Sequence, residues 1–200
     1  MGRVRAYIGL GANVGDAAST LAAAVHALDD LPGCRVRGVS RLYTTTPVGV
    51  LDQPDFHNAV AALDVTVPAG GSGSSAASSL LVALKGLEQG FGRQQRYRWG
   101  PREVDLDLLV FGRHAVSVPR PPGGESSNPA KSALPLTVPH VEARHRLFVL
   151  APLADLAPAL VPPGWGETVA SAAARQWAAE GLTAARAIAT WDGAGWRSIG

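Results

Sequence analysis

The chain of 200 residues is 46% apolar and 17% charged, which is typical of one compact domain that buries a real core. Its formal net charge of only +2 excludes a protein that relies on neutralising a nucleic-acid backbone, and it fits a local basic site for a polyphosphate better. Cys34 is the only cysteine, so the chain cannot form an intrachain disulfide, and a reducing, cytoplasmic compartment is expected.

The first third of the chain predicts three strands and one helix. Residues 4–10 are expected to form a strand. A glycine-rich turn then leads to Asp16, which is expected to cap an Ala/Leu-rich helix that ends near Pro32. Apolar and polar residues alternate over 34–46, which predicts a second strand, and residues 58–67 predict a third.

The rest of the chain combines helical segments with irregular ones. The Gly/Ser-rich residues 68–79 are typical of a flexible linker, and a helix is expected over about 80–91. A fourth strand is predicted over 105–111, and the Pro/Gly/Ser-rich residues 113–135 predict a surface loop. Two further helical segments are expected over residues 141–154 and 168–180.

The order of these elements indicates the fold class. Strands and helices that mix without regular βαβ alternation favour an α+β sandwich, in which helices pack on one antiparallel sheet. The longest apolar run, residues 147–163, is broken by Asp155 and by several prolines, so no membrane span is predicted. We therefore expect a single domain over residues 1–200.

The strongest chemical signal is the segment WGPREVDLDLLVFG, residues 99–112. Alternation along a strand predicts one face with Asp105, Asp107, Leu109 and Phe111, and another with Leu106, Leu108 and Val110. Residues two apart on a strand have Cα atoms roughly 6.5–7 Å apart. At an effective dielectric of about 20, two carboxylates at that distance repel by about 2.5 kcal/mol. Mg²⁺ accepts one or two carboxylates together with water and phosphate oxygens, so the pair predicts a magnesium site.

Four arginines stand just before this strand. They are Arg93, Arg96, Arg98 and Arg102. Guanidinium groups beside metal-bridged carboxylates form a charge pattern that is complementary to a polyphosphate. Phosphoryl transfer depends on positioning and charge stabilisation more than on a protein nucleophile, so this combination is typical of a site for that reaction.

Two other segments contain residues that are typical of nucleotide or metal sites, but neither matches a known motif. The sequence GLGANVG, residues 9–15, is one residue too long for a GxGxxG loop and is not followed by GK[ST], so it is interpreted as a strand-to-helix turn. Residues 136–153 contain histidines and arginines but no HExxH motif, so a zinc site is not expected. Hydrogen bonding or ion pairing to phosphate is the better interpretation for His140 and Arg146.

Residues 45–60 predict a binding site for a flat heterocycle. Pro47 and Pro54 stiffen this loop, which leads to Phe56 and Asn58 at the start of the third strand. An aromatic ring stacks on a flat ligand, and an amide both donates and accepts hydrogen bonds at the ligand's edge.

Taken together in this order, the four segments resemble the 6-hydroxymethyl-7,8-dihydropterin pyrophosphokinases of folate biosynthesis, over about residues 4–163. The most specific element is the spacing in GRQQRYRWGPREVDLDLLVFG, and the DQPDFHN and TVPH elements support it independently. The resemblance implies a ferredoxin-like α+β fold. It also implies that ATP and the reduced pterin are substrates, and that AMP and the pterin diphosphate are products.

The resemblance further implies roles for individual residues. Asp105 and Asp107 would hold two Mg²⁺ ions around the triphosphate, and Arg93 and Arg102 would act on the reacting phosphates. ATP would also be contacted by Glu88, Arg96, Arg98, Trp99, Leu108, Thr137, His140 and Arg146. The pterin would be held by Thr45, Thr46, Val48, Phe56, Asn58 and Phe148.

Parts of the chain depart from the family pattern. Either Gln95 or Arg96 takes the middle basic position of the arginine-rich loop, while Val141 and Pro135 replace a tyrosine and a basic residue. Residues 164–200, which contain four tryptophans, have no role assigned by the resemblance.

Two other functions stay open on the sequence. The same carboxylates would suit a two-metal nucleotidyl transferase, in which the α-phosphorus is attacked and diphosphate leaves. A non-catalytic ferredoxin-like module that binds a small molecule or RNA is the third possibility, although it lacks the aromatic pair of an RNP motif and leaves Asp105 and Asp107 unexplained. For the pyrophosphokinase, we expect the pterin hydroxyl to attack the β-phosphorus in line, in a monomer that binds neither nucleic acid nor membranes.

Overall fold

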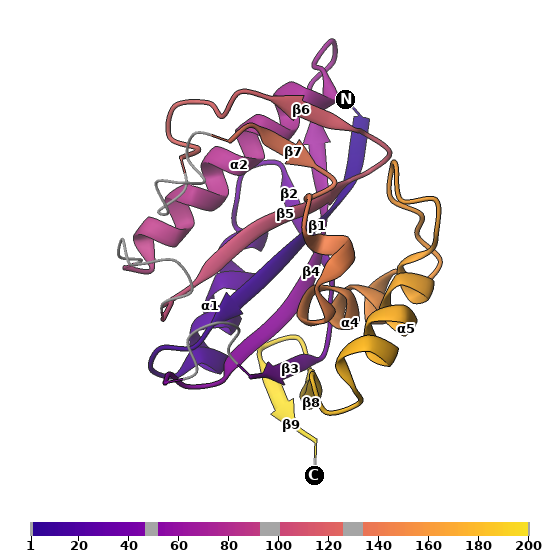
Figure 1. Cartoon of the computed structure of the whole chain (residues 1–200). Coiled ribbons are helices and arrows are strands. Elements are labelled where there is room, and N and C mark those ends of the chain that lie inside the picture. The colour runs from indigo at the N-terminus through magenta and orange to yellow at the C-terminus, as the bar shows by residue number, and fades with distance from the viewer. Residues whose placement is uncertain (1, 47–51, 93–100, 126–133, 200) are drawn as a thin grey trace.

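The computed structural model describes residues 2–46, 52–92, 101–125 and 134–199. Its main sheet is antiparallel and consists of β1 (Gly2–Ala12), β2 (Cys34–Val39), β3 (Leu42–Thr45), β4 (Phe56–Val67), β5 (Asp105–Phe111), β8 (Arg186–Trp191) and β9 (Trp196–Ser198). The strand order is β5-β1-β4-β3-β8-β9, and β2 pairs with β4 farther along that strand (Figure 1). The predicted antiparallel sheet is confirmed.

Helices cover both faces of this sheet (Figure 1). They are α1 (Ala17–Asp29), α2 (Gly73–Gly90), α4 (Leu147–Leu156) and α5 (Val169–Glu180), and a short 3₁₀ helix, η1 (Ala143–His145), precedes α4. Helices α1 and α2 pack on one face, and α4 and α5 pack on the other. The α+β sandwich predicted from the sequence is therefore confirmed.

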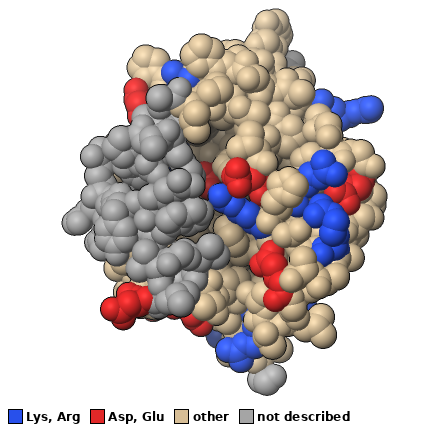
Figure 2. All heavy atoms as spheres, viewed as in Figure 1, with Lys and Arg blue, Asp and Glu red and all other residues tan. Residues whose placement is uncertain are grey.

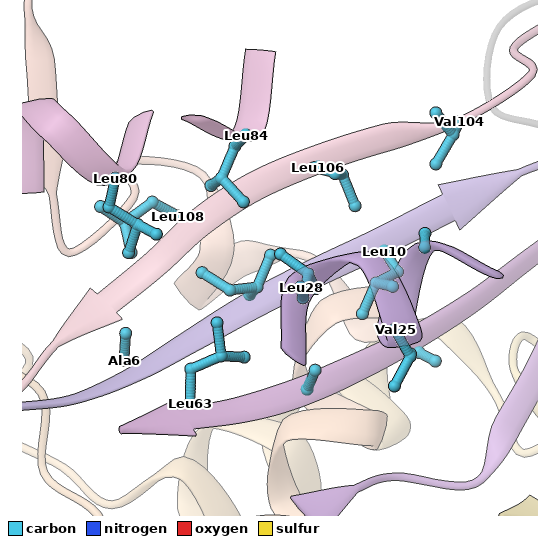
Figure 3. Packing of buried hydrophobic residues seen from close by; sticks show 14 of the residues in the cluster. Ala6, Leu10, Val25, Leu28, Leu63, Leu80, Leu84, Val104, Leu106 and Leu108 are labelled. Atoms are coloured by element: carbon cyan, nitrogen blue, oxygen red, sulfur yellow. The ribbon is translucent and has the colours of Figure 1, made fainter. Parts of the chain in front are cut away.

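The larger core lies between the sheet and the pair α1 and α2. Leu10 of β1 and Leu106 of β5 point into it and meet Leu28 of α1 and Leu84 of α2 (Figure 3). Burial of each such side chain stabilises the fold by about 1.5–3 kcal/mol. Because Leu106 of β5 points into this core, its neighbours Asp105 and Asp107 must point to the opposite face of the sheet.

A β-bulge changes the predicted faces near the end of β5. The register of β5 on β1 shifts after Leu108, so that Leu109 is the extra residue. As a result, Phe111 lies in the core beneath α1 and α2, while Val110 lies on the other face with Leu109. The predicted faces were wrong for Val110 and Phe111 because simple alternation does not reveal a bulge. The aspartates that precede the bulge are not affected.

The strand predicted over residues 34–46 is in fact two strands. Ser40 separates β2 from β3, and its N–H donates to the Val60 carbonyl at 2.9 Å. The Ser40 hydroxyl also accepts from the Val60 N–H at 2.9 Å and donates to the Arg41 carbonyl at 2.7 Å. These bonds turn the chain, so that β3 pairs with the beginning of β4 and β2 pairs with its later part.

The segment predicted as a flexible linker, residues 68–79, is partly helical. Helix α2 begins at Gly73, and the Ser72 hydroxyl caps it by accepting the Ser75 N–H at 3.0 Å. Ala77 is fully buried against the core. The linker prediction was therefore wrong for residues 73–79, because a serine cap and a buried alanine stabilise a helix despite the low-complexity composition.

The segment predicted as a surface loop, residues 113–135, also contains regular structure. Strand β6 (Val116–Val118) pairs with β7 (Leu136–Val138) in a separate two-stranded sheet. Val116, Leu136 and Val138 are buried in the main core. The loop prediction was thus wrong at β6, whereas residues 126–133 lie outside the described residues.

Other predicted elements are confirmed with changes of length. The Asp16 side chain caps α1 by accepting the Ser19 N–H at 3.0 Å. The segment 141–154 forms η1 and α4, and α5 lies where a helix was expected. Strands β8 and β9 were not predicted. No helix in the described part of the chain combines the length and the apolar character that a membrane span requires.

The cap at Ser72 gives a test of where α2 begins. We expect Ser72→Ala to lower the free energy of unfolding by about 1 kcal/mol, because it removes the acceptor for the Ser75 N–H. The matched change Ser79→Ala, at an exposed position inside α2, should be neutral or stabilising by a few tenths of a kcal/mol. Urea unfolding of both variants measures the difference. Equal effects would contradict a helix that begins at Gly73.

Candidate active site

A pocket opens on the face of the sheet that α4 and α5 cover. Strands β1, β3, β4 and β5 contribute to it, and α4 provides a further wall. The predicted site residues that line it are Thr45, Thr46, Phe56, Asn58, Arg102, Asp105, Asp107, Arg146 and Phe148. On the side of the molecule shown in Figure 2, acidic and basic side chains lie next to one another near the centre. The fold therefore brings the predicted carboxylates and the predicted aromatic and amide groups into one pocket.

Asp105 and Asp107 reach this pocket from the same face of β5, as the sequence predicts. The Arg102 guanidinium donates through Nη1 to Asp105 Oδ2 at 2.5 Å, with 26% and 13% of the two side chains exposed. Among the described residues, no cluster of three or more His, Cys, Asp or Glu side chains could hold a metal ion. The predicted metal site thus rests on two carboxylates, a donor set that suits Mg²⁺ when phosphate and water oxygens supply the remaining ligands.

Two glycines of β1 lie beside the carboxylates, and one of them, Gly11, leaves space next to the Asn58 amide. Gly9 pairs with Asp107, and Gly11 pairs with Asp105. A Cβ at Gly11 would lie 3.4 Å from Asn58 Oδ1, and both glycines line the pocket. These glycines were predicted to belong to a strand-to-helix turn, but β1 continues to Ala12. The missed signal was glycine at alternate positions of a strand, which removes side chains from one face.

The amide of Asn58 has a fixed orientation. Asn58 is buried, and its Nδ2 donates to Thr45 Oγ1 at 2.9 Å. Phe56 on β4 and Phe148 on α4 line the same pocket, and the Arg146 guanidinium carbon lies 5.7 Å from the centre of the Phe148 ring. Two aromatic rings and an oriented amide can bind a flat heterocycle by stacking and by edge hydrogen bonds.

Asn13, which was not predicted to be a site residue, connects two of the segments that surround the pocket. Its side chain is 3% exposed, and Nδ2 donates to Gln53 Oε1 and to the Pro54 carbonyl, each at 3.1 Å. Asn13 Oδ1 accepts the Arg102 N–H at 2.7 Å, and the Asn13 N–H donates to the Arg102 carbonyl at 3.0 Å. Asn13 therefore ties the segment before β4 to the segment before β5.

Four of the described residues predicted to contact ATP lie outside this pocket, on or beside β5: Glu88, Leu108, Thr137 and His140. The Glu88 carboxylate accepts the Leu106 N–H at 2.7 Å and the Lys85 ammonium at 2.6 Å. The Lys85 ammonium also donates to the Leu106 carbonyl at 3.1 Å. Lys85 and Glu88 thus bind the edge of β5 that faces away from β1.

The other predicted ATP contacts lie near the same edge. The His140 N–H donates to the Leu109 carbonyl at 2.8 Å, and Thr137 belongs to β7, which lies beside β5. The Leu108 side chain is buried in the core, so only the backbone of Leu108 can contribute to a site there. The remaining predicted site residues, Val48, Arg93, Arg96, Arg98 and Trp99, lie outside the described residues.

Fold and site together define a class of enzyme: an α+β sandwich with a pocket suited to phosphate transfer onto a flat ring. The family described as 7,8-dihydro-6-hydroxymethylpterin-pyrophosphokinase (HPPK) matches residues 7–158, and the chain belongs to this family.

Relatives with known names support this assignment. The chain is 41% identical over 159 residues to a 2-amino-4-hydroxy-6-hydroxymethyldihydropteridine pyrophosphokinase of Pseudomonas aeruginosa. The aligned residues cover 80% of this chain and 84% of the relative. It is 40% identical over 171 residues to the enzyme of the same name from Methylorubrum extorquens. That alignment covers 86% of this chain and 92% of the relative.

Solved structures show the same fold. The wild-type HPPK-DHPS of Plasmodium falciparum with pteroate matches 99% of this chain with a TM-score of 0.70 at 15% identity. A further HPPK-DHPS structure, in complex with substrates, matches with a TM-score of 0.70 at 12% identity. The chain spans about half the length of these solved chains, 48% in both cases. The likeness confirms the ferredoxin-like α+β fold that the resemblance implied.

The contacts of Asn13 predict its contribution to stability. Asn13→Ala removes three partly buried side-chain hydrogen bonds, which join Asn13 to the Gln53 side chain, the Pro54 carbonyl and the Arg102 N–H. We expect the free energy of unfolding to fall by about 2–3 kcal/mol. Gln53→Ala removes only one of these bonds, so its loss should be about 1 kcal/mol. Chemical unfolding of both variants gives the comparison, and a loss for Asn13→Ala no larger than that for Gln53→Ala would contradict the assigned contacts.

Proposed function

We propose that this chain transfers the diphosphate of ATP to the hydroxymethyl group of 6-hydroxymethyl-7,8-dihydropterin, a step of folate biosynthesis. The products are AMP and the pterin diphosphate. The observation that carries the proposal is the single pocket in which Asp105 and Asp107 lie with Phe56, Asn58 and Phe148. Membership of the HPPK family supports it.

The pterin binds at the end of the pocket formed by β3, β4 and α4. The bond from Asn58 Nδ2 to Thr45 holds the amide in one orientation. Asn58 can then accept a hydrogen bond from the edge of the ring through Oδ1 and donate one to it through the second N–H of Nδ2. Phe56 and Phe148 supply aromatic surface for the flat ring. Gly11 leaves room for the ring beside the Asn58 oxygen.

Asp105 and Asp107 would hold the Mg²⁺ that accompanies ATP, and two ions are proposed. Their carboxylates and their place in the pocket suit this cation. When bound, Mg²⁺ neutralises phosphate oxygens and so favours attack on phosphorus. Magnesium dependence and ATP as the diphosphate donor are parts of the same proposal.

The side chains of this protein position the reactants around that centre. Arg102, which pairs with Asp105, is close enough to the carboxylates to stabilise charge on the transferred phosphates. Arg146 beside Phe148 places a second cation at the pocket. The outer edge of β5, with Glu88, lies where the rest of the nucleotide can extend. The pterin hydroxyl then attacks the β-phosphorus in line while AMP leaves.

We also propose that the enzyme acts as a monomer in the cytoplasm. The half-buried single thiol of Cys34 is compatible with a cytoplasmic location.

The products of the reaction test this function directly. We expect purified protein with MgATP and 6-hydroxymethyl-7,8-dihydropterin to form AMP and the pterin diphosphate in equal amounts, as measured by chromatography of nucleotides and pterins. Release of free diphosphate would instead indicate attack on the α-phosphorus, and would contradict the proposal. Absence of AMP from folded protein would contradict it as well.

A pair of aspartate variants tests the metal-binding role in the same assay. Asp107→Asn should lower kcat at least about 100-fold, because it weakens the stabilisation of charge that develops on the phosphates. Asp64→Asn makes the same chemical change on β4 at a residue that pairs with Arg5 and Arg37. Its kcat should stay within about twofold of the unmodified protein. Full activity of Asp107→Asn would refute the metal-binding role.

A further inference from the structure

The C-terminal part of the chain lies beyond the family match, which ends at residue 158. Helix α5 and the hairpin of β8 and β9 all belong to this part, and the hairpin lies beside β3 (Figure 1). We refer to residues 159–199 as the C-terminal segment. Its contacts reach two walls of the pocket described above.

The first wall that the segment contacts is β3. Strand β8 pairs with β3 from Leu42 opposite Ala189 to Thr44 opposite Arg186. On its other edge, β3 pairs with the start of β4, where Phe56 and Asn58 lie. Strand β8 therefore makes β3 an interior strand of the sheet, which fixes the backbone that carries Thr45 into the pocket.

The second wall that the segment contacts is the start of α4. The Gln176 side chain of α5 donates through Nε2 to the His145 carbonyl at 2.9 Å. Glu167, just before α5, accepts from Arg144 of η1 at 2.9 Å. These bonds hold η1 immediately before Arg146 and Phe148, which line the pocket.

A small apolar cluster joins the two walls through the segment. It consists of the buried side chains Tyr43 of β3, Leu147 and Ala151 of α4, and Ala185 just before β8. Trp177 of α5 packs against this cluster and also against the larger cluster under α4. Side chains of the C-terminal segment therefore fill the space between β3 and α4.

Polar contacts of Tyr43 add to this connection. Its hydroxyl donates to Asp155 Oδ1 of α4 at 3.0 Å, and Arg41 donates to the same oxygen at 2.6 Å. Burial of the phenol, more than the neighbouring carboxylate, raises the pKa of Tyr43, so the hydroxyl stays protonated and can donate.

The hairpin is itself anchored at its far end. The Trp196 indole N–H donates to the Ser40 carbonyl at 3.0 Å, and a ring nitrogen of His26 on α1 lies 2.9 Å from the Ala194 carbonyl. The rings of Trp191 and Trp196 meet edge to face with centroids 4.8 Å apart. These contacts hold the hairpin at the corner between β2 and β3, so that β8 cannot shift independently of β3.

We propose that the C-terminal segment is a wedge that sets the separation of β3 and α4, with Trp177 as a positioning residue for pterin binding. Thr45 and Thr46 come from one side of the wedge, and Phe148 and Val149 come from the other. This inference rests on the proposed function for the identity of the ligand. The geometry of the wedge itself does not depend on that function.

The position of the wedge in the sheet predicts which substrate it affects. Strands β4 and β1 lie between β3 and β5, so the wedge is remote from the outer edge of β5, where Glu88 and His140 lie. A change in the wedge should therefore weaken the binding of the pterin far more than the binding of ATP, because Arg146 is the one described ATP contact of the predicted set that lies next to the wedge.

Kinetics of the full-length Trp177→Ala variant test the wedge. We expect KM for the pterin to rise about tenfold, because a small displacement of a binding wall weakens binding strongly. KM for ATP should stay within about twofold, and Trp177→Phe should restore most of the pterin affinity. Leu182→Ala is the matched control, because Leu182 belongs to the same segment and is 85% exposed. It should change neither constant.

A purely structural role for Trp177 gives a different result. Loss of folded protein lowers the apparent kcat and leaves both KM values unchanged, and this outcome would overturn the proposal. If Trp177→Ala does not fold, Gln176→Ala provides the test, because it removes the hydrogen bond to His145, while the other two side-chain bonds of Gln176, with Arg175 and Glu180, stay within the exposed surface of α5. It should raise KM for the pterin about two- to threefold, and an unchanged KM would overturn the proposal.

Amide hydrogen exchange separates this proposal from the proposed function, because it requires no substrate. In the variant that folds, exchange should be faster in residues 42–46 and 144–149, and unchanged in β5 and β7. Uniformly faster exchange, or no change at both walls, would overturn the wedge. An unmodified protein that makes no AMP would contradict the proposed function, while the exchange result would still decide on the wedge.

Discussion

Two like charges on one face of β5 are the constraint on which the site depends. Carboxylates about 7 Å apart repel by about 2.5 kcal/mol at an effective dielectric of about 20. The ion pair of Arg102 with Asp105 offsets part of this repulsion. The strand stays in place because Leu106 is buried in the core on the opposite face, and because Glu88 and Lys85 bind its backbone at the outer edge. The fold therefore presents charge that a divalent cation can neutralise.

The two faces of the sheet have different roles: one forms the larger core, and the other carries the pocket. One face packs beneath α1 and α2 and fixes the strands, whereas the other leaves a pocket beside α4. The missing side chain at Gly11 leaves space in that pocket beside Asn58, and Leu109 packs over Gly9. The shape of the pocket depends on parts of the chain that are far apart in sequence, since Asn13 links two loops and the C-terminal segment joins β3 to α4.

The sequence predicts the features that depend on local pattern. Alternation placed Asp105 and Asp107 on one face, and residue chemistry grouped Phe56 with Asn58. It failed where structure depends on distant contacts. The bulge at Leu109 arises from pairing with β1, and β8 is stabilised by β3 rather than by a strong pattern of its own. The start of α2 was also missed, because its Gly/Ser-rich sequence resembles a linker. In the structure, Ser72 caps the helix, which begins at Gly73.

The central claim is that Asp105 and Asp107 bind the metal that accompanies ATP. Crystals grown with Mn²⁺, which prefers the same oxygen ligands as Mg²⁺, and with a non-hydrolysable ATP analogue allow a direct test by anomalous diffraction. We expect anomalous peaks within metal-ligand distance of both carboxylates, with the nucleotide phosphates beside them. Manganese bound with the analogue elsewhere, and in contact with neither aspartate, would contradict this claim.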